Sequence, residues 1–202
     1  MDAYLARLPR IVRHVSILLG DRNFEPLPWT EGCDFVAEAL DRRVSIGQLI
    51  TSRVAHKTSK GTTMLVVFLD PIFDLGKGRE VMTSSFQLHG ALAEARPGEH
   101  TLIISFAKLS PDANREAVKL RRVSTVMPAS ALAFPISQHV MVPKHTPLDA
   151  EAASAWEVEH KVQRSKLPVL RFSDPVRVWY GWPRGTIVQV ERGVCVAWRV
   201  VK

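Results

Sequence analysis

Two histidines in the last third of the chain, His139 and His145, are of the residue type that most often binds metal ions in proteins. They lie in an extended-looking segment with a proline and a lysine between them, and no nearby cysteine or acid completes a set of ligands. The only cysteines, Cys33 and Cys195, are far apart in sequence and make neither a zinc motif nor a disulfide framework. We therefore expect structural histidines, reduced structural thiols, and neither a metal nor another cofactor.

Asp70 follows a predicted strand, where nuclease-like α/β folds place an aspartate that holds a catalytic metal. Such sites also need a Glu-x-Lys pair on an adjacent strand, and the strand predicted beside it carries none. Gly76-Lys77-Gly78 lacks both the preceding spacing and the following hydroxyl residue of a phosphate-binding loop. No nucleophile motif surrounds the serine, histidine and aspartate residues. We expect no catalysis by this chain alone.

Basic residues form two groups that could neutralise DNA phosphates. The net charge is +7 and the isoelectric point about 9.8, which suits a partner that is nucleic acid or an acidic protein surface. A solvated face is the alternative for both groups. One group is placed on the polar side of the first predicted helix and the other follows a later helix: Arg7, Arg10, Arg13 and His14, and Lys119, Arg121 and Arg122.

The chain of 202 residues is long enough for one large domain or two small ones with a buried core, and 46% of the residues are hydrophobic. No apolar run approaches the roughly 20 residues that span a bilayer. Arginines are scattered among the first apolar residues, unlike the separate charged and apolar regions of a signal peptide. We expect a soluble, intracellular protein with no membrane partner.

The N-terminal part alternates predicted helices and strands. Apolar residues at three- and four-residue spacing from Leu5 onward predict an amphipathic helix that ends at Gly20. Continuous apolar runs at 62–69 and 101–107 predict strands that are buried on both faces. The other predicted elements are helices at 35–50, 86–95 and 110–120 and an extended stretch at 132–140. Because strands and helices alternate, we expect an α/β fold with some parallel pairing.

The C-terminal part differs, so we expect an α/β domain at 1–137 and a small α+β domain at 138–202. Thr146 and Pro147 have the pattern of a helix start, and the predicted helix runs to about residue 164. Alternating valines then predict a hairpin that turns at Arg192-Gly193.

Between that helix and that hairpin stand several turn signals. Asp174-Pro175 is a turn-initiating pair, because Asp bonds its own downstream backbone and proline fixes φ. Gly181 and Gly185 bracket a tight corner between extended segments. Trp182 inside this corner is poorly placed to pack a core, and we expect it to anchor a partner.

Six short motifs follow one another in the last third of the chain. They are His139 to His145 as H-x-x-V-P-x-H, the helix from Pro147 to Arg164, Leu167-Pro168, Asp174-Pro175-Val176, Tyr180-Gly181 with Arg184-Gly185, and Trp198-Arg199-Val200-Val201. No single motif is specific. In this order and register they resemble the fifth common subunit of eukaryotic nuclear DNA-directed RNA polymerases, together with its archaeal counterpart.

The resemblance implies a non-catalytic subunit in the nucleus, or in the nucleolus if it serves only the ribosomal-RNA polymerase. It implies an N-terminal jaw domain that flanks downstream duplex DNA, and a C-terminal assembly domain that docks on the largest subunit of the multi-subunit complex. The residues expected at the assembly interface are His145, Asp174, Pro175, Tyr180, Gly181, Trp182, Arg184, Gly185, Arg192 and Arg199. Those expected near downstream DNA are Ser110, Pro111, Lys119, Arg121 and Arg122.

The chain also departs from the family pattern. Its hairpin tip, Arg192-Gly193, is shorter than usual, and Val178 and Pro183 replace residues of a more polar, interface-like type. These departures favour either a divergent lineage or a duplicated copy dedicated to one polymerase class. The alternatives are a free-standing basic nucleic-acid-binding protein, which would bind DNA in a salt-dependent way, and an enzyme with an unrecognised site.

Overall fold

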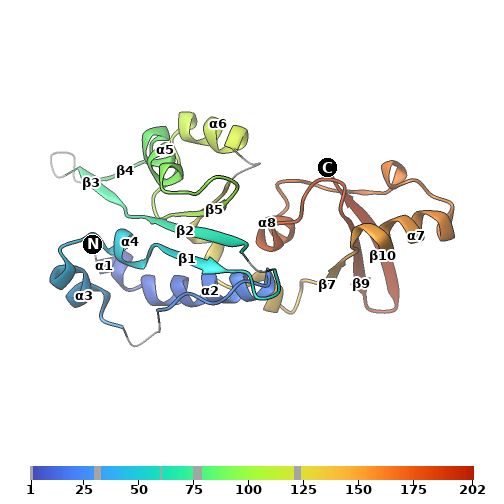
Figure 1. The fold of residues 1–202 in the computed structure, drawn as a ribbon, viewed down its shortest axis with the longest axis horizontal. Helices are drawn as coiled ribbons and strands as arrows, with labels where there is room; N and C mark the ends of the chain where they lie inside the picture. Colours follow the sequence, from blue (N-terminus) through green and yellow to red (C-terminus); the bar gives the residue numbers. More distant parts are fainter. Residues whose placement is uncertain (1, 30–32, 60, 75–78, 121–123) are drawn as a thin grey trace. The chain divides into compact units, whose positions relative to one another are not determined.

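The structure is a computed structural model (Figure 1). It describes residues 2–29, 33–59, 61–74, 79–120 and 124–202. Contacts divide the chain into two compact units, Met1–Phe134 and Pro135–Lys202, and each is described by itself. Gly76-Lys77-Gly78 and the pair Arg121-Arg122 lie outside the described residues. No helix in the described parts of the chain is long and apolar enough to cross a membrane.

The unit Met1–Phe134 is built around a sheet with the strand order β1-β2-β5-β6. Strands β2, β5 and β6 run parallel, whereas β1 is antiparallel to β2. Strands β3 and β4 form a separate antiparallel pair. The elements are α1 (Asp2–Leu5), α2 (Leu8–Asp21), α3 (Phe35–Arg42), α4 (Ile46–Ile50), β1 (Ser52–Ala55), β2 (Thr63–Leu69), β3 (Ile72–Asp74), β4 (Arg79–Val81), α5 (Ser85–Ala93), β5 (His100–Ser105), α6 (Pro111–Lys119), β6 (Ser124–Pro128) and the 3-10 helix η2 (Ala129–Leu132).

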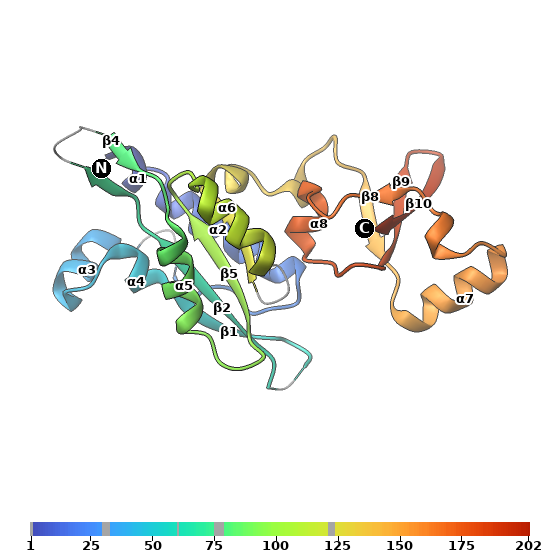
Figure 2. The same ribbon diagram turned by 90° about the horizontal axis from the view of Figure 1, so that it is seen from above.

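The two strands predicted from continuous apolar runs are confirmed, and so is their parallel pairing. Both strands are buried along nearly their whole length, because helices cover both faces of the sheet. On one face, Leu65, Val67 and Ile103 pack against Leu88 of α5 and Ala113 of α6. Figures 1 and 2 show α5 and α6 on this face and α2 along the other. This layering agrees with the predicted α/β class.

The first predicted helix is present as α2, and its apolar stripe is buried. The prediction that His14 lies on its polar side is wrong. His14 stands three residues after Ile11 and four before Leu18, which places it on the buried stripe. It is 9% exposed, and its Nδ1 lies 2.6 Å from the carbonyl oxygen of Leu132. This histidine therefore links α2 to η2 and does not face a nucleic acid.

The single helix predicted at 35–50 is two helices, α3 and α4. Arg43 ends α3 in the left-handed conformation, with φ of 55°. Ser45 then begins α4 with a capping box, since its side chain accepts from the Gln48 N–H and Gln48 bonds back to the Ser45 backbone. The helix predicted at 110–120 is confirmed as α6, with Ser110 as its N-cap.

The extended stretch predicted at 132–140 is wrong. The third parallel strand, β6, lies earlier, at Ser124–Pro128, where it pairs with β5. Pro128 and Pro135 each precede a 3-10 helix, because their fixed φ angles of −70° and −74° lead the chain into a turn. The residues just after Pro128 form the 3-10 helix η2, and the stretch between the two prolines contains no strand.

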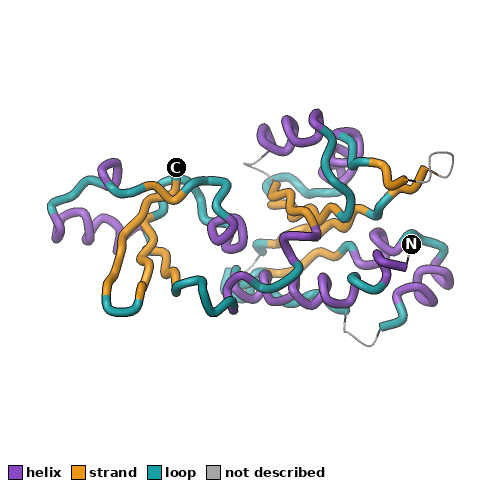
Figure 3. The backbone as a smooth tube through the Cα atoms, turned by 180° about the vertical axis from the view of Figure 1, so that it is seen from behind, coloured by secondary structure: helices purple, strands orange, loops and turns teal. Residues whose placement is uncertain are grey.

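The unit Pro135–Lys202 has a sheet of order β7-β9-β10-β8, with β8 parallel to β10 and the other pairs antiparallel (Figure 3). Ala153 and Trp156 of α7 pack on one face, and Val176 of α8 and Trp182 pack on the other. The elements are η3 (Ile136–Gln138), β7 (Lys144–Pro147), α7 (Ala150–His160), η4 (Arg164–Lys166), β8 (Val169–Leu170), α8 (Pro175–Tyr180), β9 (Ile187–Arg192) and β10 (Cys195–Val201).

Helix α7 starts later than predicted, because Thr146 and Pro147 belong to strand β7. The N-cap is Asp149, whose Oδ1 accepts the N–H of Ala152 at 2.8 Å. The helix ends at His160, before Lys161 in the left-handed conformation with φ of 52°.

The hairpin of β9 and β10 is confirmed, but its turn is one residue further along than predicted. Arg192 pairs with Cys195, so the loop residues are Gly193 and Val194. Gly193 has φ of 58°, which suits the first position of a two-residue hairpin loop and which other residue types adopt at a cost.

Candidate functional site

Most residues predicted at an assembly interface lie in or around α8 and the loop that follows it. Asp174 and Pro175 begin α8, Tyr180 is its last residue, and Gly181 is its C-cap. Arg184 and Gly185 follow in the loop before β9. We call the segment 174–185 the corner segment.

Asp174 and Pro175 start a helix, so the prediction that this pair initiates a turn is wrong. The corner at Gly181 and Gly185 accordingly joins helix α8 to strand β9, and not two extended segments as the sequence predicts. Oδ1 of Asp174 accepts the N–H of Val176 at 2.9 Å, and Pro175 occupies the first helical position, where its missing N–H costs least. The same residue types favour a turn and a helix start. The helix is favoured here because the apolar residues that follow, Val176 and Trp179, are buried in the core.

Two glycines let the chain leave α8 and enter β9. Gly181 has φ of 73°, and its N–H donates to the carbonyl oxygen of Arg177 at 2.8 Å. Gly185 has φ of 85°, and its N–H donates to the carbonyl oxygen of Val201 at 2.9 Å. A side chain at either position would be strained, so these glycines set the path of the corner segment.

Trp182 belongs to the core, and the prediction that it anchors a partner is wrong. It is 8% exposed and packs with Val188 and Val190 of β9. The Tyr180 ring stacks on it with 4.7 Å between centroids and 2° between planes, and the His145 ring lies 6.3 Å away. The tight loop turns the indole inward, which sequence spacing alone does not reveal.

Arg177 is a residue of this region that the sequence reasoning missed. It is 8% exposed, and its Nε donates to the carbonyl oxygen of Trp182 at 2.7 Å. Its guanidinium carbon is 3.3 Å from the centroid of the Phe172 ring, and that of Arg184 is 4.6 Å from the same centroid. If Asp174-Pro175 is read as a helix start, Arg177 falls at the third helical position, within the corner segment.

His145 lies on β7, is half-buried, and has Nδ1 2.6 Å from the carbonyl oxygen of Pro143. Burial lowers the pKa of His145, and the positive charges of Arg192 and Arg199 lower it further. The bond to Pro143 and the charge of Asp174 act in the opposite direction but do not reverse the shift. The imidazole therefore stays neutral near neutral pH.

Arg184 and Arg192 are exposed, whereas Arg199 is half-buried and donates from Nη1 to the carbonyl oxygen of Val169 at 3.3 Å. Large apolar side chains are exposed in the same unit, among them Val140 and Met141 before β7 and Val194 and Val196 at the hairpin tip. Exposed arginines beside exposed apolar side chains are typical of protein-binding surfaces.

The three described residues among those predicted near DNA lie at opposite ends of α6. Ser110 and Pro111 are at the start of α6, where the Ser110 Oγ accepts the N–H of Ala113 at 3.1 Å. Lys119 is at the other end, about 13 Å away at 1.5 Å per residue, and its Nζ lies 2.6 Å from Oε1 of Glu116. Arg121 and Arg122 lie outside the described residues.

The candidate catalytic aspartate has a structural role. Asp70 accepts the hydroxyl of Tyr4 at 2.6 Å and the N–H of Gly47 at 2.8 and 2.9 Å. A Glu-x-Lys sequence does occur at 159–161, but it lies at the end of α7 in the other unit. Within the described ranges, no group of three or more His, Cys, Asp or Glu residues is arranged to hold a metal ion.

Comparison with known proteins identifies relatives of the C-terminal unit. Residues 134–201 match the family described as RNA polymerase Rpb5, C-terminal domain. The RNA polymerase subunit Rpo5 of Pyrococcus horikoshii is 36% identical over 73 residues, which are 34% of this chain and 89% of that subunit. The subunit rpabc1 of RNA polymerases I, II and III from Dictyostelium discoideum is 37% identical over 57 residues, 28% of this chain. The Caenorhabditis elegans subunit RPABC1 is 33% identical over the same share.

The alignments cover 29% of the Dictyostelium subunit and 27% of the Caenorhabditis elegans one, so the chain spans under a third of these eukaryotic relatives. The archaeal subunit, in contrast, is covered almost completely. The resemblance read from the six motifs is thereby confirmed. The chain belongs to the Rpb5 family of DNA-directed RNA polymerase subunits, which includes archaeal Rpo5 and eukaryotic RPABC1.

Proposed function

We propose that this chain is a non-catalytic subunit of a nuclear DNA-directed RNA polymerase. In this proposal 138–202 is an assembly domain that docks on the largest subunit, and 1–137 is a jaw that flanks downstream duplex DNA. One observation carries the proposal: the family match at 134–201 coincides with the compact unit Pro135–Lys202. A module with its own sheet and its own core can serve as a docking unit.

The predicted interface residues divide into two kinds. Asp174, Gly181 and Trp182 shape the corner segment from within, through a helix cap, a left-handed turn and core packing. Arg184 and Arg192 are exposed and can reach a partner. Because a guanidinium pairs with carboxylates through two parallel hydrogen bonds, these two arginines are the proposed contacts with acidic residues of the largest subunit.

The proposed jaw would meet DNA at the start of α6, where Ser110 is the N-cap and Pro111 is the first helical residue. A capped helix start offers shape and backbone contact and carries no sequence readout, which suits an enzyme that moves along any template. A photo-crosslinking amino acid at position 110 of the assembled enzyme should link to downstream DNA. The same group at Gln48 of α4 serves as the comparison, and equal linking from both positions would contradict this placement.

The departures from the family pattern support a copy that serves one polymerase class. The hairpin loop has only two residues, Gly193 and Val194, and Pro183 stiffens the corner segment. We expect the chain to associate with the largest subunit of one class. If that class transcribes ribosomal RNA, the protein should concentrate in the nucleolus.

Purification of the tagged chain from its source, with identification of the chains that accompany it, tests the proposed function. The expected result is recovery of large polymerase subunits in a fixed ratio to the tagged chain. An Arg184→Glu, Arg192→Glu double variant should recover less of them, while Lys166→Glu on η4, outside the predicted interface, should not. Recovery without large polymerase subunits would favour the alternative, a free-standing nucleic-acid-binding protein.

A further inference from the structure

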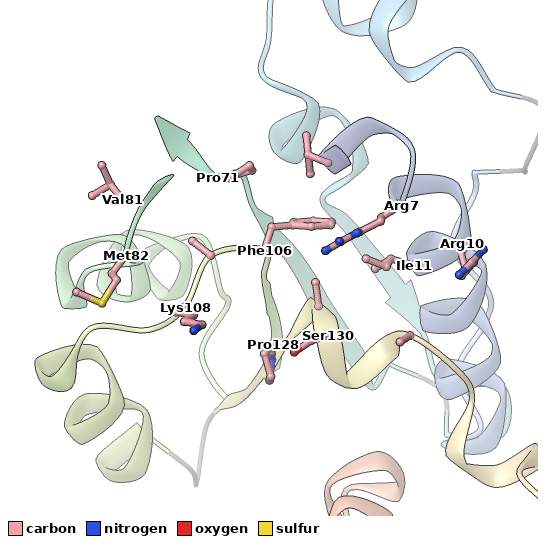
Figure 4. A pocket seen from close by; sticks show the side chains of 14 residues that line it. Arg7, Arg10, Ile11, Pro71, Val81, Met82, Phe106, Lys108, Pro128 and Ser130 are labelled. Atoms are coloured by element: carbon pink, nitrogen blue, oxygen red, sulfur yellow. The ribbon is translucent and has the colours of Figure 1, made fainter. Parts of the chain in front are cut away.

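A pocket of about 700 Å³ opens in the unit Met1–Phe134 (Figure 4). It lies at the carboxyl ends of the parallel strands β2, β5 and β6. Pro71 lines it shortly after β2, Phe106 and Lys108 follow β5, and Ser130 follows β6. In open α/β sheets, ligands bind at this edge, because the loops after parallel strands meet there. The volume is within the roughly 300–1,000 Å³ of ordinary ligand pockets.

The walls of the pocket are mainly apolar. Ile11 of α2 lies opposite Val81 and Met82, which come from β4 and the residue after it. Tyr4 and Phe106 meet edge to face, with 4.6 Å between ring centroids and 85° between planes. Val81 and Met82 are 40% and 53% exposed, so they present apolar surface at the pocket.

One polar group beside this wall, the Tyr4 hydroxyl, is already engaged. The Tyr4 hydroxyl donates to Asp70, and that carboxylate also accepts the N–H of Gly47. Asp70 does not line the pocket, so its charge is held within the fold. Burial, followed by the nearby Asp70, raises the pKa of Tyr4, which keeps the phenol neutral. The apolar wall therefore offers few hydrogen-bonding groups of the kind that read a nucleotide base.

The rim of the pocket is positively charged. Arg7, Arg10 and Lys108 are exposed and line it, and no acidic residue is among the described lining residues. Arg7 is the residue before α2, and Figure 4 shows its side chain extending towards Phe106. Three cations around an apolar pocket attract a ligand that combines negative charge with a large apolar group.

We propose that this pocket binds an acidic segment of a partner protein, with an aromatic or large aliphatic side chain inserted between Ile11 and Met82 and carboxylates beside Arg7, Arg10 and Lys108. Duplex DNA does not fit the arrangement, because its outer surface presents phosphates and no large apolar group that could fill the pocket. The proposal does not depend on the polymerase role of the chain.

Fluorescence polarisation with the full chain tests the proposal. The probe is a labelled peptide of aspartates and glutamates with two phenylalanines. Its controls are the same peptide with serine in place of phenylalanine, the peptide with lysine in place of the acids, and a labelled DNA duplex. We expect the acidic phenylalanine peptide to bind at least about tenfold more tightly than the serine peptide, since only the aromatic side chain buries a large apolar surface in the pocket.

Variants localise the binding. Arg7→Glu with Arg10→Glu should weaken binding about tenfold, whereas Arg13→Glu, one turn further on α2 and outside the pocket, should change it less than twofold. Met82→Asp, at an exposed position, should also weaken it while leaving the circular dichroism spectrum unchanged. Equal binding of the serine or lysine peptide, or insensitivity to the Arg7 and Arg10 changes, would overturn the proposal. Binding of the DNA duplex would also overturn it, if the duplex bound more tightly than the peptide and the same variants abolished that binding.

Discussion

The Nε of Arg177 donates a hydrogen bond to the carbonyl oxygen of Trp182 at 2.7 Å, and both residues are buried. The bond connects α8 to the loop that follows it, and the exposed Arg184 lies in the same loop. The corner segment, which contains most of the predicted interface residues, is therefore held from inside by an arginine that no interface motif marks.

We predict that Arg177→Lys destabilises the C-terminal unit by about 1–3 kcal/mol, because lysine lacks the planar group that lies over Phe172 and leaves the Trp182 carbonyl poorly satisfied. Tryptophan fluorescence during denaturant unfolding measures this, since Trp156, Trp179, Trp182 and Trp198 lie in this unit. Arg184→Lys at the exposed position is the control and should change stability by less than about 0.5 kcal/mol. A stable Arg177→Lys variant would contradict the role given to this bond.

A second prediction concerns Gly47 in α4. A Cβ there would lie 2.4 Å from the carbonyl oxygen of Phe68 and 2.8 Å from Oδ2 of Asp70. Gly47→Ala should therefore force these backbone and side-chain groups apart and destabilise the N-terminal unit by several kcal/mol, on the order of 2–4.

Gly90→Ala provides the matched control, because a Cβ at this position in α5 would meet nothing within 4 Å. Alanine there should stabilise the helix by about 0.5–1 kcal/mol. Thermal unfolding followed by circular dichroism compares the two variants. Similar melting temperatures for both would show that the backbone contact at Gly47 is not close.

A third prediction is a loss of stability in acid through Glu99. Burial alone would raise the pKa of this carboxyl, but bonds from the Arg96 N–H, the Thr63 hydroxyl and the Arg53 guanidinium lower it below the usual 4.5. The unfolded chain thus binds this proton more readily than the folded one. The stabilisation is complete above about pH 4.5 and is lost as the pH falls below it.

Denaturant unfolding of wild-type and Glu99→Gln protein between pH 3 and pH 7 measures this contribution. The variant should be less stable at pH 7 by about 1–3 kcal/mol, because the contacts of the buried Glu99 side chain with Arg53 are weakened. The difference between the two proteins should shrink towards pH 3. A difference in stability that is constant over this range would show that the ionisation of the Glu99 carboxyl does not contribute to it.

A fourth prediction is that His145 titrates below 6.5, chiefly because burial disfavours its charged form. Its contribution to stability should decline as the pH falls below about 6.5, since the unfolded histidine takes up a proton first. Proton NMR titration of the His145 imidazole measures this pKa. A value of 6.5 or above would be inconsistent with its half-buried position.

The sequence predicts this fold best where one pattern has one meaning. The apolar runs at 62–69 and 101–107 are short, rich in β-branched residues and bounded by turn signals, which favours buried strands, and the spacing of apolar residues in α2 favours a helix. Asp174-Pro175 suits both a turn and a helix start, and Trp182 suits both a core and an anchor. Those two choices depend on tertiary packing, which local sequence does not contain.

The candidate sites follow the same division. The motifs from His139 to Val201 identified the family correctly, because six weak signals share one register. Arg177 was missed because its role depends on the backbone of Trp182, and the pocket was missed because its lining comes from segments scattered from Tyr4 to Ala133. Side chains that meet only through folding leave no local spacing to read.

Cross-linking mass spectrometry of the polymerase that co-purifies with the tagged chain tests the central claim most directly. The exposed lysines of the C-terminal unit, Lys144, Lys161, Lys166 and Lys202, provide the reactive groups. We predict that links from these lysines to other chains go chiefly to the largest polymerase subunit. Links from them only to smaller subunits, or a purified complex with no largest subunit, would contradict docking through residues 138–202.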